Sequence, residues 1–341
     1  MRAAVLYSPF KIKIEEKPIL KINSGEVLIK TKAAAICGSD VRLYRGEKKA
    51  NLPRTIGHEF SGEVVSVGKQ IKSIHCGDRV TIQPVISCGS CTNCRKGKTN
   101  ICLKRKVIGY DYEGGFAEYI RIPKEGISNI CVLPKTVSYE IGALAEPYAA
   151  CLNGIKKLFL EKLDSVLVIG TGPIGLMLIQ LIRNFGVDQI FVSDPLTERL
   201  EISLKFGADY TINPTEIKLS KFVLEKRHGL GFDKVVITAG KPDLLGELLE
   251  VVNKGGIINI FAGCPPNSIV RINPNHIHYG EITVNGSESS TVDQMKEILT
   301  MMEKEKINPE LLITQKFSLE QIEQAIKCKA ENKILKPLIV L

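Results

Sequence analysis

Long hydrophobic runs and aromatic residues are scarce in this chain of 341 residues. No apolar run approaches the roughly 20 residues that a membrane-spanning helix needs. The first residues lack the long apolar core of a signal peptide. Internal repeats and low-complexity tracts are also missing. We therefore expect a cytoplasmic, globular protein without a membrane partner.

The chain carries a formal net charge of +9, which raises the question of nucleic-acid binding. Its densest basic cluster surrounds a group of cysteines and contains no aromatic residue that could stack on bases. The members of this cluster are Arg95, Lys96, Lys98, Lys104, Arg105 and Lys106. We interpret it as a solvated surface and expect no nucleic-acid partner.

The pattern of the chain changes near residues 149 and 286. Residues 1–149 hold short β-like runs separated by Gly, Pro and Asp, which indicates an antiparallel, barrel-like domain. Residues 150–286 alternate buried strands and helices, with a helix expected at 173–185, and this predicts a parallel sheet covered on both faces. Residues 287–341, with helices expected at 292–305 and 319–330, return to the first domain.

A glycine-rich turn closes the first buried strand of residues 150–286 and opens a helix. It reads Gly170-Thr171-Gly172-Pro173-Ile174-Gly175. In this context a G-x-G-x-x-G turn is typical of dinucleotide binding, because the helix N-terminus offers free N–H groups to a pyrophosphate. Asp194 after the next strand can hydrogen-bond the adenosine ribose and repel a 2′-phosphate, which favours NAD, although Arg199 could counter this preference. The alternative is a plain βαβ turn with Asp194 as a helix cap.

Four of the ten cysteines lie within fifteen residues. They are Cys88, Cys91, Cys94 and Cys102. Thiolates at this spacing can surround one tetrahedral zinc, and a site closed by four protein ligands is structural. An iron–sulfur cluster also uses four cysteines, but its common runs have other spacings.

Four further residues with metal-binding side chains are scattered along the first domain. They are Cys37, His58, Glu59 and Glu146. Each alone is more often a packing residue than a ligand. Together they would suit a catalytic zinc with one open position, but the sequence pattern by itself does not connect them.

These segments together resemble the zinc-containing medium-chain dehydrogenases, and in particular the branch of polyol and threonine dehydrogenases. The similarity extends over essentially the whole chain. It rests on the motifs C-G-S-D at 37–40, G-H-E-F-S-G at 57–62, the four-cysteine loop, G-G-F-A-E-Y at 114–119 and the glycine turn.

The resemblance implies a GroES-like catalytic domain, residues 1–149 and 287–341, with both zinc sites, and a Rossmann NAD-binding domain, residues 150–286. It implies that Cys37 and His58 bind the catalytic zinc, that Glu59 binds it permanently or in exchange, and that Glu146 binds it directly or through water. Asp40 would then accept a hydrogen bond from the other ring nitrogen of His58. Ser39 would pass the substrate proton outward.

Two positions depart from the family pattern. Arg42 replaces a histidine that continues the proton relay in many relatives, and an arginine stays protonated. It could bind a cofactor phosphate or a substrate phosphate, or lie on the surface. The loop at 286–290 lacks the arginine that holds the polyol in sorbitol dehydrogenases, which puts sorbitol itself in doubt.

We therefore expect an oxidoreductase that transfers hydride between NAD and a secondary alcohol of a polyol or sugar derivative. Polar residues near Cys37 and the lack of an aromatic wall disfavour simple aliphatic alcohols. An L-threonine 3-dehydrogenase or a polyol-phosphate dehydrogenase is the alternative activity. Rival interpretations are a non-catalytic zinc- and nucleotide-binding redox sensor and a zinc-free quinone reductase. A homotetramer or homodimer is expected.

Overall fold

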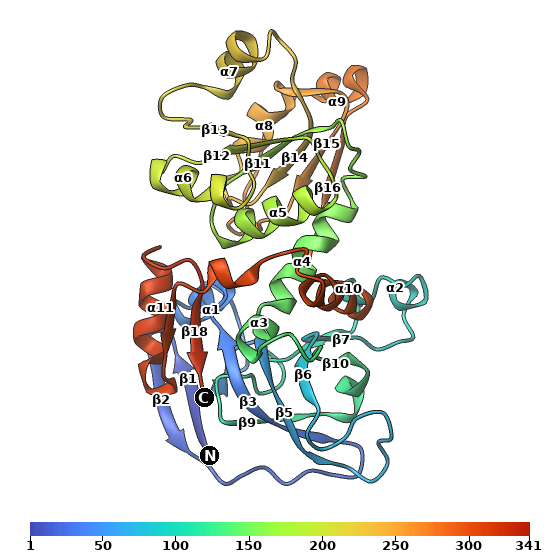
Figure 1. The fold of residues 1–341 in the computed structure, drawn as a ribbon, viewed down its shortest axis with the longest axis vertical. Coiled ribbons are helices and arrows are strands. Elements are labelled where there is room, and N and C mark those ends of the chain that lie inside the picture. The colour runs from blue at the N-terminus through green and yellow to red at the C-terminus, as the bar shows by residue number, and fades with distance from the viewer. The chain divides into compact units, whose positions relative to one another are not determined.

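The chain forms two units, and the second is inserted into the first along the sequence. The computed structural model describes all residues from Met1 to Leu341. One unit comprises Met1–Ala149 and Ser289–Leu341, and the other comprises Ala150–Glu288 (Figure 1). The return to the first unit lies two residues after the position that the sequence pattern indicated. None of the helices has both the length and the apolar character needed to cross a bilayer.

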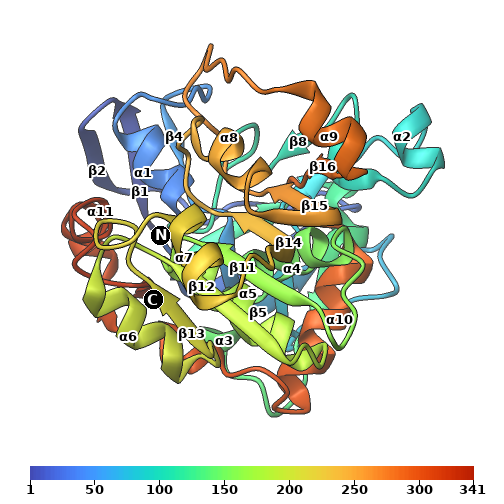
Figure 2. The same ribbon diagram turned by 90° about the horizontal axis from the view of Figure 1, so that it is seen from above.

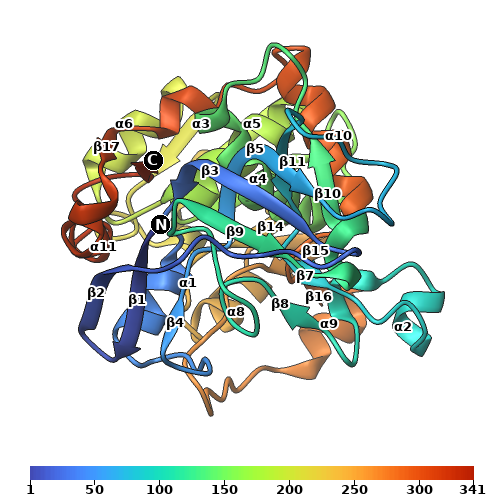
Figure 3. The same cartoon turned by 90° about the horizontal axis from the view of Figure 1, so that it is seen from below.

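The first unit is built from short strands that are mostly antiparallel. Its larger sheet has the order β10-β6-β5-β3-β18-β17, with β9 also pairing with β3 (Figure 3), and its smaller sheets are β2-β1-β4 and β7-β8. The strands are β1 (Arg2–Ser8), β2 (Lys11–Glu16), β3 (Val27–Ala35), β4 (Arg54–Thr55), β5 (Glu59–Val67), β6 (Arg79–Ile82), β7 (Val85–Ile86), β8 (Lys106–Val107), β9 (Tyr119–Ile122), β10 (Ile130–Val132), β17 (Gln315–Phe317) and β18 (Pro337–Val340).

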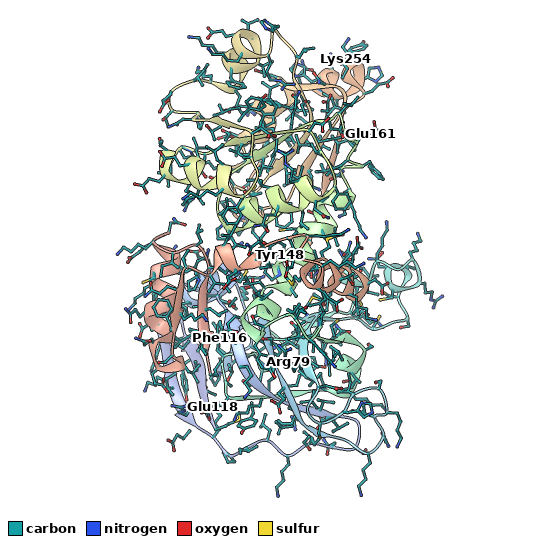
Figure 4. The ribbon with its side chains drawn as sticks, in the orientation of Figure 1. Arg79, Phe116, Glu118, Tyr148, Glu161 and Lys254 are labelled. Atoms are coloured by element: carbon teal, nitrogen blue, oxygen red, sulfur yellow. The ribbon has the colours of Figure 1, made fainter.

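Side chains alternate between the interior and the surface of this unit, as the pleat of extended chain requires. Phe116 is fully buried, and Ile29 and Ile120 pack in the same core. Two residues after Phe116, Glu118 binds Arg2 at 2.7 Å on the outer side of the unit (Figure 4). The closed core explains why so many short strands hold together.

Helices complete the first unit. The helices expected at 292–305 and 319–330 are present, but the second begins with a separate 3-10 turn, η4 (Leu319–Gln321). The helical segments are α1 (Gly38–Tyr44), α2 (Thr92–Arg95), η1 (Thr99–Ile101), η2 (Lys124–Asn129), α3 (Tyr139–Ala143), α4 (Ala145–Lys156), which continues into the second unit, α10 (Val292–Glu303), η3 (Pro309–Leu312), η4 and α11 (Ile322–Ala330).

The second unit is a parallel six-stranded sheet of order β13-β12-β11-β14-β15-β16 (Figure 2). In sequence order this is 3-2-1-4-5-6, the doubly wound arrangement that binds dinucleotides, so the predicted fold class is confirmed. Helices α5 and α6 lie on one face and α7 and α8 on the other (Figure 1). The elements are β11 (Ser165–Ile169), α5 (Pro173–Asn184), β12 (Gln189–Ser193), α6 (Thr197–Lys205), β13 (Tyr210–Ile212), α7 (Leu219–Lys226), β14 (Phe232–Ile237), α8 (Leu244–Leu249), β15 (Val252–Ile260), α9 (Pro274–Gly280) and β16 (Thr283–Gly286).

Candidate active site

The register of three neighbouring strands brings distant residues to one end of the first unit's sheet. Strand β3 ends at Ala35, which pairs with Glu59 at the start of β5. Cys37, two residues beyond β3, and His58, one residue before β5, therefore lie at the same end. On the other side of β3, Leu338 of β18 also pairs with Ala35.

Three of the predicted ligands gather here. The Cys37 sulfur, a ring nitrogen of His58 and a carboxylate oxygen of Glu59 all lie within 4.8 Å of one another. His58 is 7% exposed and Glu59 is fully buried, so these donors face little water. Cys37 is partly exposed, and sulfur, nitrogen and oxygen donors gathered in one place are a ligand set that zinc accepts.

Helix α1 orients the histidine. Asp40 is fully buried near the start of this helix, and its Oδ2 accepts a hydrogen bond from the Cys37 N–H at 2.9 Å. Its Oδ1 lies 3.4 Å from His58 Nδ1, while the other ring nitrogen, Nε2, lies 3.4 Å from Ser39 Oγ. Burial lowers the pKa of His58, but Asp40 and Tyr110 outweigh it, so this pKa lies well above its ordinary value. The arrangement favours a positive charge at His58, which a metal ion bound at Nε2 would provide.

A buried lysine, which the sequence analysis did not single out, contacts the same centre. Lys336 is 3% exposed, and its Nζ lies 2.5 and 2.8 Å from the two oxygens of Glu59. Burial lowers the pKa of Lys336, but the nearby charges of Glu59 and Cys37 raise it by more, so this pKa lies above its ordinary value. The lysine therefore stays charged and holds the Glu59 carboxylate from the side of β18.

Glu146 lies near this centre but outside the tight set of three donors. It is the second residue of α4 and is 8% exposed; Tyr148, two residues later, is fully buried (Figure 4). Burial raises the pKa of the Glu146 carboxyl to about 7, with His58 and Lys336 opposing this rise and Glu59 adding to it. The charges of His58, Glu59 and Lys336 therefore affect the pKa of the Glu146 carboxyl, although Glu146 is not one of the three clustered donors.

The four cysteines of the loop after β7 form a second cluster. Their sulfur atoms are separated by 3.5 Å (Cys88–Cys102), 3.4 Å (Cys91–Cys94), 3.8 Å (Cys91–Cys102) and 4.0 Å (Cys88–Cys94). A tetrahedron with zinc–sulfur bonds of about 2.3 Å has edges of about 3.8 Å. Backbone N–H groups of Ser90 and Cys91 lower the pKa of the Cys88 thiol to about 5, which favours the thiolate that a metal needs. The cluster fits a four-thiolate zinc site.

In the second unit, the glycine turn has the geometry that the motif predicts. Gly170 has φ +90°, and a Cβ on Gly175 would lie 2.0 Å from the Gly170 oxygen. Gly172 caps the N-terminus of α5, whose first residue is Pro173. Glycine is required at 170 and 175 to avoid strain or a clash, whereas at Gly172 a Cβ would meet no atom within 4 Å and the backbone stays open to a ligand.

Asp194 is anchored at the end of β12. It is 3% exposed, and its two oxygens accept the N–H of Thr171 at 2.9 Å and of Leu196 at 3.0 Å. Arg199 Nη1 lies 3.9 Å from Oδ2. Because each carboxylate oxygen has two lone pairs, both can still accept a ribose hydroxyl.

Two residues near His58 were missed by the sequence analysis. Lys336 precedes the apolar strand Leu338–Val340 without any motif, and its position depends on the pairing of β18 with β3. Tyr110, whose ring centre lies 5.7 Å from that of His58, sits in a loop shortly before the G-G-F-A-E-Y segment. For Tyr110, the one sequence signal was its position shortly before the G-G-F-A-E-Y motif. For Lys336, no sequence signal indicated a place near His58.

Comparison with known proteins gives consistent matches over the whole chain. Residues 23–134 match the family model described as the alcohol dehydrogenase GroES-like domain, and residues 173–304 match that of the zinc-binding dehydrogenases. The chain is 37% identical to the L-threonine 3-dehydrogenase of Caldanaerobacter subterraneus subsp. tengcongensis over 279 residues, 80% of this chain and 78% of that protein. It is 34% identical to the D-arabitol-phosphate dehydrogenase of Enterococcus avium over 321 residues, 93% and 90% of the two chains. An alcohol dehydrogenase structure (rspB) from E. coli CFT073, solved with NADH, superposes with a TM-score of 0.94 at 30% identity, covering 100% of this chain and 99% of that one.

Proposed function

The chain belongs to the zinc-binding medium-chain alcohol dehydrogenase family, and from this membership we propose that it transfers hydride between NAD and a secondary alcohol of a polyol or sugar derivative. It is a zinc-dependent, NAD(P)-linked alcohol or polyol dehydrogenase. The observation that supports the proposal is the set of Cys37, His58 and Glu59, with donors within 4.8 Å of one another and with His58 and Glu59 buried.

The residues of this centre have separate roles in the proposed reaction. Cys37, His58 and Glu59 would hold a zinc ion, which would supply Lewis acidity to lower the pKa of the substrate hydroxyl, and NAD would supply the hydride acceptor. Asp40 Oδ1, 3.4 Å from His58 Nδ1, would orient the ring and leave Nε2 for the metal. Fixing the ring in this way is how a carboxylate behind a histidine ligand orients it.

Proton transfer and charge balance fall to other side chains. Oxidation of the alcohol releases one proton from the hydroxyl, and Ser39 Oγ, 3.4 Å from His58 Nε2, is placed to accept it and pass it outward. Lys336 balances the charge of Glu59. Glu146 contributes a second carboxyl near the metal, directly or through water, which suits a substrate with neighbouring hydroxyl groups.

Support for the substrate class comes from polar residues that follow Cys37 in the sequence. Arg42 and Arg45 lie on α1 and just beyond it, each within 4.0 Å of Glu47. Such surroundings suit a hydroxylated chain better than an aliphatic alcohol. The relatives named above act on L-threonine and on D-arabitol phosphate, so these two substrate types are the alternatives within the same reaction.

A substrate screen tests the proposed function. Purified enzyme is offered polyols, polyol phosphates, sugar acids, L-threonine and simple primary alcohols, and NADH absorbance is followed. We expect turnover with one of the hydroxylated or acidic classes. Efficient oxidation of primary alcohols alone would contradict the substrate class, and no oxidation of any alcohol would favour the redox-sensor interpretation.

We expect the enzyme to prefer NAD to NADP. A hydrogen bond between a charged carboxylate and a ribose hydroxyl is worth about 1.5–3 kcal/mol, so kcat/KM should be higher with NAD by about tenfold or more. Replacing Asp194 with glycine should lower kcat/KM for NAD and narrow this difference. In the control variant Arg199→Ala, kcat/KM with NADP should not rise, because Arg199 is the cation beside Asp194. Equal or better use of NADP by the natural enzyme would show that the interpretation of Asp194 is wrong.

The expected oligomer, a homotetramer or a homodimer, belongs to the same proposal. Strand β16 is at the edge of the six-stranded sheet, and an open edge can pair with another chain. In the same part of the sequence Ile269 is 85% exposed and Tyr279 is 71% exposed. An open sheet edge and exposed apolar side chains are both typical of an interface between copies.

A further inference from the structure

An exposed lysine lies over an aromatic ring that contacts the metal-binding histidine. The ring centre of Tyr110 is 5.7 Å from that of His58. Lys48 Nζ lies 4.4 Å from the Tyr110 ring centre and donates a hydrogen bond to the hydroxyl at 3.2 Å. These distances place the ammonium group within about 10 Å of the His58 ring.

The chain holds both residues in place through its backbone. Lys48 belongs to a turn after α1, in which the N–H groups of Glu47 and Lys48 both bond to the Arg42 carbonyl at 2.8 and 3.3 Å. The Tyr110 N–H bonds to the Val107 carbonyl at 3.1 Å, directly after β8. Two anchored turns therefore hold the backbone positions from which the Lys48 and Tyr110 side chains extend toward each other.

Lys48 has no carboxylate partner. Its neighbour Glu47 is engaged with Arg42 and Arg45 at 4.0 and 3.9 Å, and the one hydrogen bond of the ammonium group is to Tyr110. An ammonium group has three donors, so two remain. The Tyr110 hydroxyl accepts from Lys48 and keeps its own proton to donate. Three N–H and O–H donors thus stay available beside one another, with a positive charge that nothing neutralises.

We propose that Lys48 and Tyr110 bind the anionic end of the substrate, a phosphate ester or a carboxylate, while its alcohol carbon is oxidised at the centre formed by Cys37 and His58. The inference rests on the proposed function and restricts its substrates to alcohols that carry a phosphate or carboxylate group. Several donors and a positive charge match a phosphate or carboxylate group. A neutral polyol presents no charge to this pair, so the pair would favour an acidic substrate over the corresponding neutral one.

The test compares each polyol phosphate with its free polyol, and sugar acids with their reduced forms. We expect kcat/KM to be higher for the anionic member, and the variant Lys48→Met to reduce this ratio by about tenfold. Lys48→Arg should keep most of the ratio, and Tyr110→Phe should lower it in part. The matched control is Lys49→Met, an exposed neighbour with the same charge, which should leave the ratio unchanged. The preference should also weaken at high ionic strength, because Lys48 is exposed.

The arms of this experiment separate the outcomes. A preference for phosphate esters alone or for carboxylates alone identifies which group is bound. If free and anionic substrates are oxidised equally well, or if Lys48→Met changes thermal stability but not the ratio, the inference is wrong and the dehydrogenase function stands. If no alcohol is oxidised, isothermal titration of the zinc-loaded protein with inorganic phosphate decides: binding that Lys48→Met weakens supports the anion site, and no binding overturns it.

Discussion

Replacing Cys37 or His58 with alanine is expected to lower kcat/KM by about 1,000-fold or more. Lewis-acid polarisation supplies several kcal/mol of transition-state stabilisation, and each loss of about 1.36 kcal/mol slows the reaction tenfold. Both side chains lie at strand ends, beyond β3 and before β5. Neither belongs to the hydrophobic core of the first unit. The fold should therefore remain, and turnover should not.

Three measurements check this expectation together. Turnover is measured with the best substrate of the screen, zinc by elemental analysis, and the fold by the thermal unfolding midpoint. The control is Cys76→Ala, because Cys76 is an exposed cysteine outside both metal clusters. Turnover near the natural rate in Cys37→Ala, with the metal content also unchanged, would show that this sulfur is not a ligand of the reactive metal.

Replacing Cys91 with serine is expected to have a different result, a loss of stability. A structural zinc contributes its binding free energy to folding, and the tetrahedral spacing of the four sulfur atoms indicates such a site. Losing a few kcal/mol would lower the unfolding midpoint by about 5–10 °C. We also expect poorer expression, and one zinc per chain in place of two.

The two cysteine variants make a crossed comparison. Cys37→Ala should keep one zinc and its stability but lose turnover. The folded fraction of Cys91→Ser should also keep one zinc, but it should be less stable and still turn over substrate. Cys76→Ser is the matched control for the second variant. A natural protein that carries one zinc or none when prepared without chelator would contradict the expectation of two sites.

The local parts of both sites could be predicted from the sequence. The four cysteines and the glycine turn each lie in one short segment, so their spacing alone specifies their geometry. Cys37 and His58 could be connected only through resemblance to a family, since their proximity depends on the register of β3 against β5. A shift by one residue would turn every side chain to the other face of the sheet, and nothing local specifies that register.

Two features of the structure differ from what the sequence pattern indicates, one for a local reason and one for a long-range reason. The apolar run at 257–260 is only the last part of strand β15, which runs over Val252–Ile260. Lys254, Gly255 and Gly256 interrupt the apolar pattern, yet the backbone continues to pair with β14 through an irregularity between Phe232 and Lys234. Lys336 was not expected because a lysine before an apolar strand is usually exposed. Its burial depends on Glu59, a residue from the opposite part of the chain.

The insertion of one unit into the other has a consequence for biosynthesis. Strand β18 pairs with β3 across about 300 residues, so the first unit stays incomplete on the ribosome until all of Ala150–Glu288 has been made, which takes on the order of 10 s. The cysteine loop is contained in fifteen residues and can take up zinc as soon as it emerges. Lys336, the partner of Glu59, is translated long after this loop. The order of translation thus places the four-cysteine loop well before the Lys336 partner of Glu59.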